Sequence, residues 1–166
     1  MEIPVTLASI DVQEARLAEA FAAADIGRAR DLYHPEVVYV SPTTRLFGRP
    51  PQIMGIDEAF EFIQLTITGC RNIAYRCEER AVLPGGEAAY ARIAFDWDTE
   101  DVRLRSVYAV VYRYRQGAIA RQELYYDPSG PLERLGPPRP RTSPGPAPPP
   151  KGRGWRRDPP AAPPPG

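Results

Sequence analysis

The side chains best suited to catalysis occur where the sequence alternates in the manner of a β-strand. In "EAAYARIAFDWD", alternation places Arg92 and Asp96 on one face and a row of apolar side chains on the other. A carboxylate in an apolar cavity has a raised pKa, which suits it to general acid–base catalysis, and a guanidinium can hold a carboxylate or an enolate. Because positions i and i+4 of a strand lie about 13 Å apart, Arg92 and Asp96 are expected to bracket a ligand rather than to pair.

A third ionisable candidate, Glu123, lies near the end of the predicted hairpin "YRYRQGAIARQELYYDP". Gln116 and Gly117 predict a tight turn in this stretch. Alternation places Glu123 on the face opposite Gln122 and Leu124, but does not by itself say which of the two faces looks into a cavity. On the outer face Glu123 would be a salt-bridge partner. A catalytic role for Glu123 remains the alternative.

Each charged candidate also has a purely structural interpretation. Asp96 and Asp98 precede the turn "TED" and would then be solvated near the end of a hairpin. Arg92 would form a cross-strand ion pair with Glu78 or Glu123. The tyrosines of the strands would fill the core. The sequence leaves both interpretations open.

The elements that must position these residues follow from periodicity and turn signals. Asp11 and Glu14 fit a capping box that would start a first helix. Two further helices are predicted at 26–33 and 55–69, and strands at 36–42, 72–80, 87–98, 102–115 and 118–126. Residues 43–54 are expected to form a loop and 131–136 a last helical turn. This order predicts an α+β domain, a cone-shaped curved antiparallel sheet with three helices packed on its concave face.

Composition divides the chain into a domain, 1–136, and a tail, 137–166. The tail carries six of the 21 basic residues and one of the 21 acidic residues, which leaves the domain with a net charge of −5. An acidic domain argues against nucleic acid as a ligand. The tail is rich in Pro and Gly and nearly free of aliphatic side chains, so we expect it to be disordered, with polyproline II character.

The sequence lacks the signals that are typical of several other classes of protein. No apolar stretch approaches the roughly 18 residues of a membrane span, and the N-terminus does not have the pattern of a signal peptide. We therefore expect a cytoplasmic protein without a membrane partner, in which Cys70 and Cys77 are free thiols. The sequence has no metal-ligand set, phosphate loop or dinucleotide fingerprint, so we expect neither a metal nor another cofactor.

Three pieces in this order resemble a known family: "ARDLYHPEVVYVSP", "GIDEAFEFI" and the closing hairpin. The chain resembles SnoaL-like and ketosteroid-isomerase-like proteins of the nuclear transport factor 2-like superfamily over about residues 11–136. This fold hosts isomerases, cyclases, dehydratases, epoxide hydrolases and non-catalytic modules, so the resemblance implies the fold more specifically than the reaction.

The resemblance also implies which faces look into the cone. It points Arg92 and Asp96 inward and Glu123 away from the cone, and these three are the catalytic candidates. It assigns the apolar face of 87–98, with Ile93, Phe95 and Trp97, to a homodimer interface through the sheet. The implied substrate-binding residues are Tyr39, Ser41, Tyr90, Tyr108, Tyr112, Gln122 and Tyr126.

The chain departs from the catalytic patterns of the family at three positions. Leu124 stands where SnoaL-type proteins have their catalytic acid, and Ser41 and Val110 stand at the base and paired acid of ketosteroid isomerases. A literal ketosteroid isomerase is therefore not expected. Epoxide hydrolases of this fold use an Arg–Asp set and a second Asp, for which Asp98 and Glu123 are the candidates.

Two functions follow from the sequence. The first is a cofactor-free acid–base enzyme of isomerase, cyclase or epoxide-hydrolase type, acting on a small apolar oxygenated compound. The second is a non-catalytic ligand-binding or dimerisation module of the same fold. The ionisable groups inside the cone distinguish the two, because only the enzyme needs a group there that transfers protons.

Overall fold

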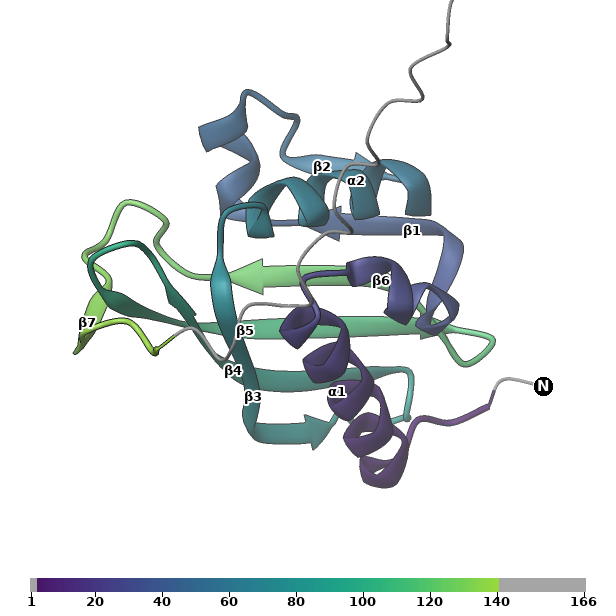
Figure 1. Ribbon diagram of the computed structural model, residues 1–166. Helices are drawn as coiled ribbons and strands as arrows, with labels where there is room; N and C mark the ends of the chain where they lie inside the picture. The colour runs from purple at the N-terminus through teal and green to yellow at the C-terminus, as the bar shows by residue number, and fades with distance from the viewer. Residues whose placement is uncertain (1–2, 141–166) are drawn as a thin grey trace, which may run out of the picture.

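The computed structural model describes residues 3–140, which form two α-helices, two 3₁₀ helices and seven strands (Figure 1). The helices are α1 (Leu7–Ala22), η1 (Ile26–Leu32), η2 (Pro42–Phe47) and α2 (Ile56–Ile67). The strands are β1 (Tyr33–Val40), β2 (Gln52–Met54), β3 (Arg71–Val82), β4 (Ala88–Asp98), β5 (Arg103–Arg115), β6 (Ala118–Tyr125) and β7 (Glu133–Gly136). Most of the predicted tail lies outside the described residues, so its disorder stays a prediction.

The strands form one curved sheet in the order β2–β1–β6–β5–β4–β3, and β7 pairs with the start of β5. Strands β3 to β6 run antiparallel to one another in chain order, as predicted. Strand β1 instead pairs with β6 in parallel, with Tyr39 opposite Gln122. The predicted α+β class is confirmed, and the parallel pair brings the start of the domain beside its end.

The helices cover one face of this sheet, its concave side (Figure 1). Helix α1 packs on β3, and α2 packs beside β1. The core between the layers is formed by fully buried apolar side chains from helices and strands alike, among them Leu17, Phe62, Ile93 and Val110. The three predicted helices correspond to α1, η1 and α2. No helix among the described residues is long and apolar enough to cross a membrane.

The predicted start of the first helix is wrong, because α1 begins four residues before Asp11. The Thr6 hydroxyl accepts from the Ser9 N–H (3.2 Å), and the Ser9 hydroxyl oxygen accepts from the Thr6 N–H (2.9 Å). This reciprocal pair satisfies two backbone donors that a helix otherwise leaves unbonded. Glu14 therefore lies in the second turn, where its side chain turns toward the core.

Two loop predictions also need correction. The expected loop at 43–54 contains η2 and β2, and the Ser41 hydroxyl accepts from the Thr43 N–H at the start of η2. The expected helical turn at 131–136 is the strand β7, because these residues find backbone partners on β5. The turn at Gln116 and Gly117 is confirmed, since both residues have positive φ (54° and 79°).

Candidate ligand-binding site

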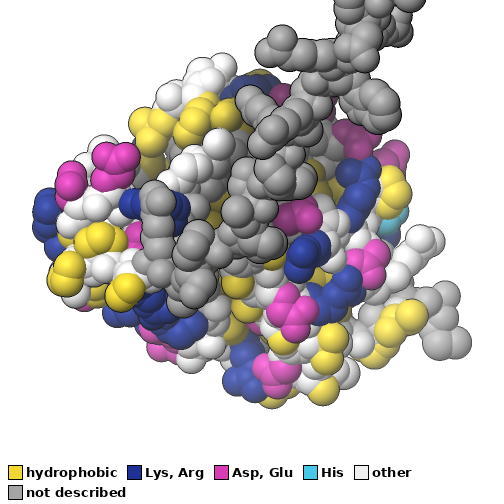
Figure 2. Space-filling model, in the orientation of Figure 1, with side chains coloured by type: hydrophobic (Ala, Val, Ile, Leu, Met, Phe, Trp, Pro, Cys, Tyr) yellow, Lys and Arg dark blue, Asp and Glu magenta, His cyan; other side chains and the backbone are white. Residues whose placement is uncertain are grey.

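A cavity of about 380 Å³ lies between the concave face of the sheet and the helices. Nine of its 23 lining residues are aromatic, and Asp127 is the one charged residue among them. Figure 2 shows the contrast with the outer surface, where basic and acidic side chains are interspersed over the side that carries the helices. The cavity is therefore an apolar, aromatic site of the size that small organic ligands occupy.

The cavity is lined by β4 residues of the face opposite to the one predicted. Phe95 lies opposite Ser106 in the β4–β5 register, and both line the cavity with Trp97. The Phe95 ring also packs edge-on against Phe21 of α1 (5.4 Å between centroids). Apolar side chains gain most from burial, so this row faces the helices. The predicted inward face of β4 was wrong by one residue, which is enough to exchange the two faces of a strand.

Five of the seven predicted substrate-binding residues line the cavity: Tyr39, Ser41, Tyr108, Gln122 and Tyr126. Tyr112 shares their side of the sheet but is fully buried in the core behind the cavity. Tyr90 belongs to the face of β4 that points away from the helices. The alternation of β1, β5 and β6 thus predicted the cavity wall correctly, whereas that of β4 did not.

Two side chains of the wall retain unused donors. The Tyr33 hydroxyl donates to Gln122 Oε1 (2.7 Å), which orients the amide, and Gln122 Nε2 has no partner among the described residues. The Tyr108 hydroxyl likewise has no hydrogen-bond partner within residues 3–140. The Ser41 and Tyr126 hydroxyl oxygens lie 3.5 Å apart. A bound oxygen atom can therefore accept hydrogen bonds from the Tyr108 hydroxyl and the Gln122 amide.

The tyrosines of the wall are suited to donate hydrogen bonds rather than to accept protons. Burial raises the pKa of Tyr33, Tyr39, Tyr75 and Tyr108 above the ordinary value for a phenol. A phenolate would lose hydration in this apolar site, so these side chains stay neutral at physiological pH. They can stabilise negative charge that develops on a ligand oxygen.

The three predicted catalytic residues lie on the uncovered, convex face of the sheet. Arg92 forms an ion pair with Glu78, one of the two partners considered from the sequence. Glu123 accepts hydrogen bonds from Arg121 and Tyr125, which hold its pKa below the usual value. The expectation that Arg92 and Asp96 enter the cone is corrected, and the expected outward orientation of Glu123 agrees with the register of β6.

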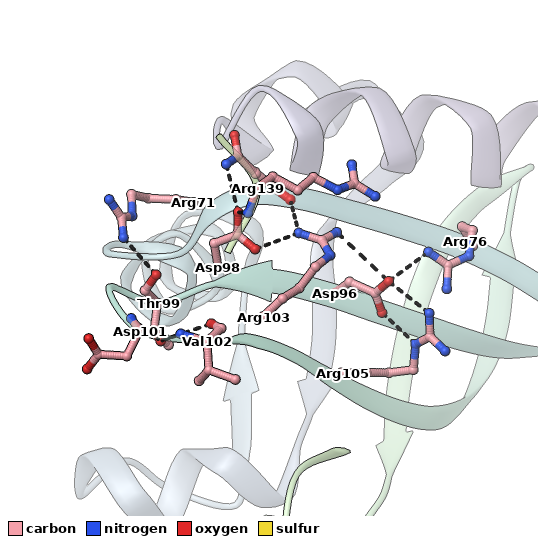
Figure 3. Close-up of polar contacts among 11 residues, drawn as sticks. Arg71, Arg76, Asp96, Asp98, Thr99, Asp101, Val102, Arg103, Arg105 and Arg139 are labelled. Atoms are coloured by element: carbon pink, nitrogen blue, oxygen red, sulfur yellow. Dashed lines mark hydrogen bonds and ion pairs between the residues drawn. The ribbon is translucent and has the colours of Figure 1, made fainter. Parts of the chain in front are cut away.

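Asp96 is neither a cavity residue nor a solvated one. Its buried carboxylate accepts from Arg105 (2.7 and 3.0 Å) and from Arg76 (3.0 Å), as Figure 3 shows. Burial opposes ionisation of Asp96, but these bonds outweigh it and hold the pKa low. Asp98 continues the network, accepting from Arg103 (2.8 Å) and from the backbone N–H of Arg139 (2.9 Å).

Sequence reasoning missed Glu14, the buried carboxylate nearest to the cavity wall. Glu14 Oε2 accepts from the Tyr75 hydroxyl (2.6 Å), and Tyr75 lines the cavity. Glu14, Leu17 and Phe21 occupy positions i, i+3 and i+7 of α1, so they share one face of the helix. This spacing was visible in the sequence, but assigning Glu14 to a capping box concealed it.

The family of this chain is identified from its sequence. The profile of the SnoaL-like domain matches residues 15–122, and the chain belongs to this family. No curated protein sequence matches the chain.

Solved structures with the same architecture have low sequence identity. RV0760c from Mycobacterium tuberculosis, in complex with estradiol-17β-hemisuccinate, superposes with a TM-score of 0.59 at 15% identity, covering 72% of this chain and 95% of that chain. A protein with a ketosteroid isomerase-like fold from Catenulispora acidiphila, in complex with trimethylamine, gives 0.57 at 13%, covering 70% and 86%. An NTF2-like protein from Burkholderia pseudomallei gives 0.59 at 17%, covering 72% and 91%. These similarities establish the fold alone.

Proposed function

We propose that this SnoaL-like domain binds a small, largely apolar, oxygen-bearing molecule inside the cone. The supporting observation is the aromatic cavity of about 380 Å³ with unused donors on Tyr108 and Gln122. Apolar burial supplies the affinity, and the two donors recognise an oxygen acceptor. The solved relatives with estradiol-17β-hemisuccinate and trimethylamine are complexes of the same fold with small organic ligands.

The ionisable side chains that line the cavity limit the kinds of ligand that it can bind. Among residues 3–140, no Lys, Arg or His lines the cavity, and Asp127 is acidic. A carboxylate or phosphate in such a site would lose its hydration without gaining a cationic partner, which is strongly unfavourable. We therefore expect a neutral ligand, such as a ketone, an enone or an epoxide.

Trp97 provides the test of binding, because it lines the cavity. In a Trp155→Phe protein, Trp97 is the one remaining tryptophan. We expect acetophenone to quench its fluorescence in a saturable manner and benzoate, its anionic counterpart, not to do so. Tyr108→Phe should weaken acetophenone about five- to tenfold, the effect of one lost hydrogen bond, and leave toluene unchanged. Benzoate binding more tightly than acetophenone would refute the proposal.

The second candidate is an acid–base enzyme working without a cofactor in this cavity, of isomerase, cyclase or epoxide-hydrolase type. It is favoured by the placement of Glu14 directly behind Tyr75. Incubating the protein with β,γ-enones and epoxides and analysing the mixture by mass spectrometry and NMR tests it. Ligands that bind but are recovered unchanged would identify a non-catalytic binding module instead.

We also propose that two copies associate through the convex face of the sheet. The expected interface row Ile93, Phe95 and Trp97 is excluded, since these side chains face the core and the cavity. The convex face instead exposes Val107 and Tyr125 (38% and 56% exposed) on neighbouring strands. Apolar side chains with ion pairs around them are typical of a surface that pairs with its own copy.

A further inference from the structure

Glu14 is a buried carboxylate held only by neutral groups. It is 5% exposed, and its oxygens accept from the Tyr75 hydroxyl (2.6 Å) and the Gln13 amide (3.1 Å). Within residues 3–140 no basic side chain pairs with it. Removing an ionised carboxylate from water costs several kcal/mol unless a cation compensates. Glutamine would fit the same volume without that cost, so a carboxylate here suggests a role that requires ionisation.

The surroundings of Glu14 favour its neutral form. Burial raises the pKa of Glu14, against the opposing effect of hydrogen bonds from the Tyr75 hydroxyl and the Gln13 amide. The titratable groups that face it are Tyr33 of β1, Tyr75 and Cys77 of β3, and Tyr108, Tyr112 and Tyr114 of β5. Beyond Cys77 lies the surface ion pair of Asp11 and Arg80. No group in direct contact with Glu14 among these carries a positive charge.

Tyr75 connects this carboxylate to the cavity. Its ring stacks on Phe21 (5.0 Å between centroids), and both side chains line the cavity. With Glu14 ionised, the hydroxyl hydrogen of Tyr75 is directed to Glu14. With Glu14 protonated, the carboxylic acid can donate to the Tyr75 oxygen instead, and the hydroxyl hydrogen of Tyr75 becomes free to turn toward the cavity.

A second, independent observation, at Tyr112, indicates that the hydrogen bonds around Glu14 rearrange. Its hydroxyl is fully buried beside Glu14 and has no hydrogen-bond partner of ordinary geometry among the described residues. A buried donor without a partner is unfavourable, because it has lost its hydrogen bond to water without replacement. Tyr112 is placed to donate to a carboxyl oxygen of Glu14 when Tyr75 turns away, which would give its hydroxyl the partner that it lacks here.

We propose that Glu14 and Tyr75 form the proton-exchanging pair of the cavity, in which Tyr75 donates its hydroxyl proton to an oxygen of the bound molecule and Glu14 replaces that proton. In the opening of an epoxide by water, the O–H bond of Tyr75 breaks as an O–H bond forms on the epoxide oxygen, which takes up the electron pair of the breaking C–O bond. The O–H bond of Glu14 breaks as that of Tyr75 is restored, and the proton that the adding water gives up returns to Glu14. Tyr75 loses one proton and gains one, so it never becomes a phenolate. The negative charge that appears on Glu14 is stabilised by Tyr112 and Gln13. This role deepens the proposed function and rests on it for the ligand class.

The test uses acetophenone labelled with ¹³C at the carbonyl, whose stretching frequency falls as the oxygen accepts a stronger hydrogen bond. In the full-length protein, we expect the bound carbonyl to shift to lower frequency at low pH and to move back as Glu14 ionises. The dissociation constant should rise about fivefold over the same interval, as expected for one lost hydrogen bond.

Two variants separate this role from a structural one. In Glu14→Gln, the amide donates permanently to the Tyr75 oxygen, so the low frequency and tight binding should persist at every pH. Tyr75→Phe should show the high frequency and about fivefold weaker binding at every pH. Glu19→Gln is the control, because Glu19 lies exposed on the same helix. A carbonyl frequency that still follows pH in Glu14→Gln would overturn the proposal.

A measurement without ligand separates failure of the pair from failure of the proposed function. In protein labelled with ¹³C at the Glu side-chain carboxyl, Glu14 should titrate above its ordinary value of 4.5, and higher still in Tyr75→Phe. An ordinary titration of Glu14 overturns the pair even if acetophenone binds. If Glu14 titrates as expected but acetophenone does not bind, the pair is supported and the proposed ligand class fails.

Discussion

At the scale of single residues, Asp96 illustrates how partners decide what a carboxylate does. The sequence placed it in an alternating strand near a hairpin, where both a catalytic and a solvated role were consistent with the pattern. The structure surrounds it with Arg76, Arg103 and Arg105 on the convex face. A carboxylate held by several guanidinium groups is a poor proton acceptor, because its ionised form is strongly stabilised.

Asp96→Asn should therefore affect stability and not ligand binding. We expect the free energy of unfolding at pH 7 to fall by about 2–3 kcal/mol, below the usual effect of breaking a buried ion pair because Arg76 and Arg105 reach water. Since the folded pKa of Asp96 is lowered, its contribution is fully present above the unfolded value of 3.8 and is lost as the pH falls through the folded value.

Urea unfolding from pH 7 down to a pH below the folded pKa of Asp96 measures this difference. Wild type and Asp96→Asn should converge in acid. Asp101→Asn, in the exposed neighbouring hairpin, is the control and should resemble wild type throughout. A loss of acetophenone binding in a folded Asp96→Asn protein would contradict the assignment of Asp96 to the convex face.

Alternation predicts the cavity residues of a strand only where its inner face can be told from its outer face. Gln122 and Tyr126 alternate with Glu123 and Tyr125, and both members of the first pair line the cavity. On β4, polar and apolar faces both looked plausible as cavity walls, and only contact with α1 decides between them. The helical spacing of Glu14 was visible in the sequence, but its contact with Tyr75, a residue distant in the chain, was not.

At the scale of elements, the N-terminus of α1 determines where Glu14 points. The Thr6 and Ser9 pair starts the helix, and the 3.6-residue period then turns Glu14, Leu17 and Phe21 to one side. Local sequence signals were misleading here, because Asp11 and Glu14 also have the spacing of a capping box. The strands were predicted better, since long alternating stretches are distinctive, whereas the short β2 and β7 depend on partners elsewhere in the chain.

Thr6→Ala tests this assignment of the helix start. We expect it to lower the free energy of unfolding by about 1 kcal/mol, the usual contribution of an N-cap side chain. Asp11→Ala is the comparison, because it removes only an exposed ion pair with Arg80 and should change stability much less than Thr6→Ala does. The reverse order in thermal or urea unfolding would restore Asp11 as the cap.

At the scale of the whole molecule, the helices cover one face of the sheet and leave the other uncovered. If two copies pair through that convex face, light scattering on the eluted protein should give about twice the chain mass of 18.5 kDa. Val107→Arg would bury a charge in such an interface and should yield monomers, whereas Glu100→Arg in the exposed β4–β5 turn should not. A monomeric wild type would end the dimer proposal.

The parallel pairing of β1 with β6 affects the order in which the chain can fold. Tyr39 and Gln122 are neighbours in the sheet but lie 83 positions apart in the chain. Contacts of such long sequence separation raise the contact order and slow folding. During synthesis, β1 emerges early and lacks this neighbour until residues 118–125 have left the ribosome. Until then the nascent chain exposes apolar surface, so its folding should be delayed until β6 emerges and should be sensitive to chaperones.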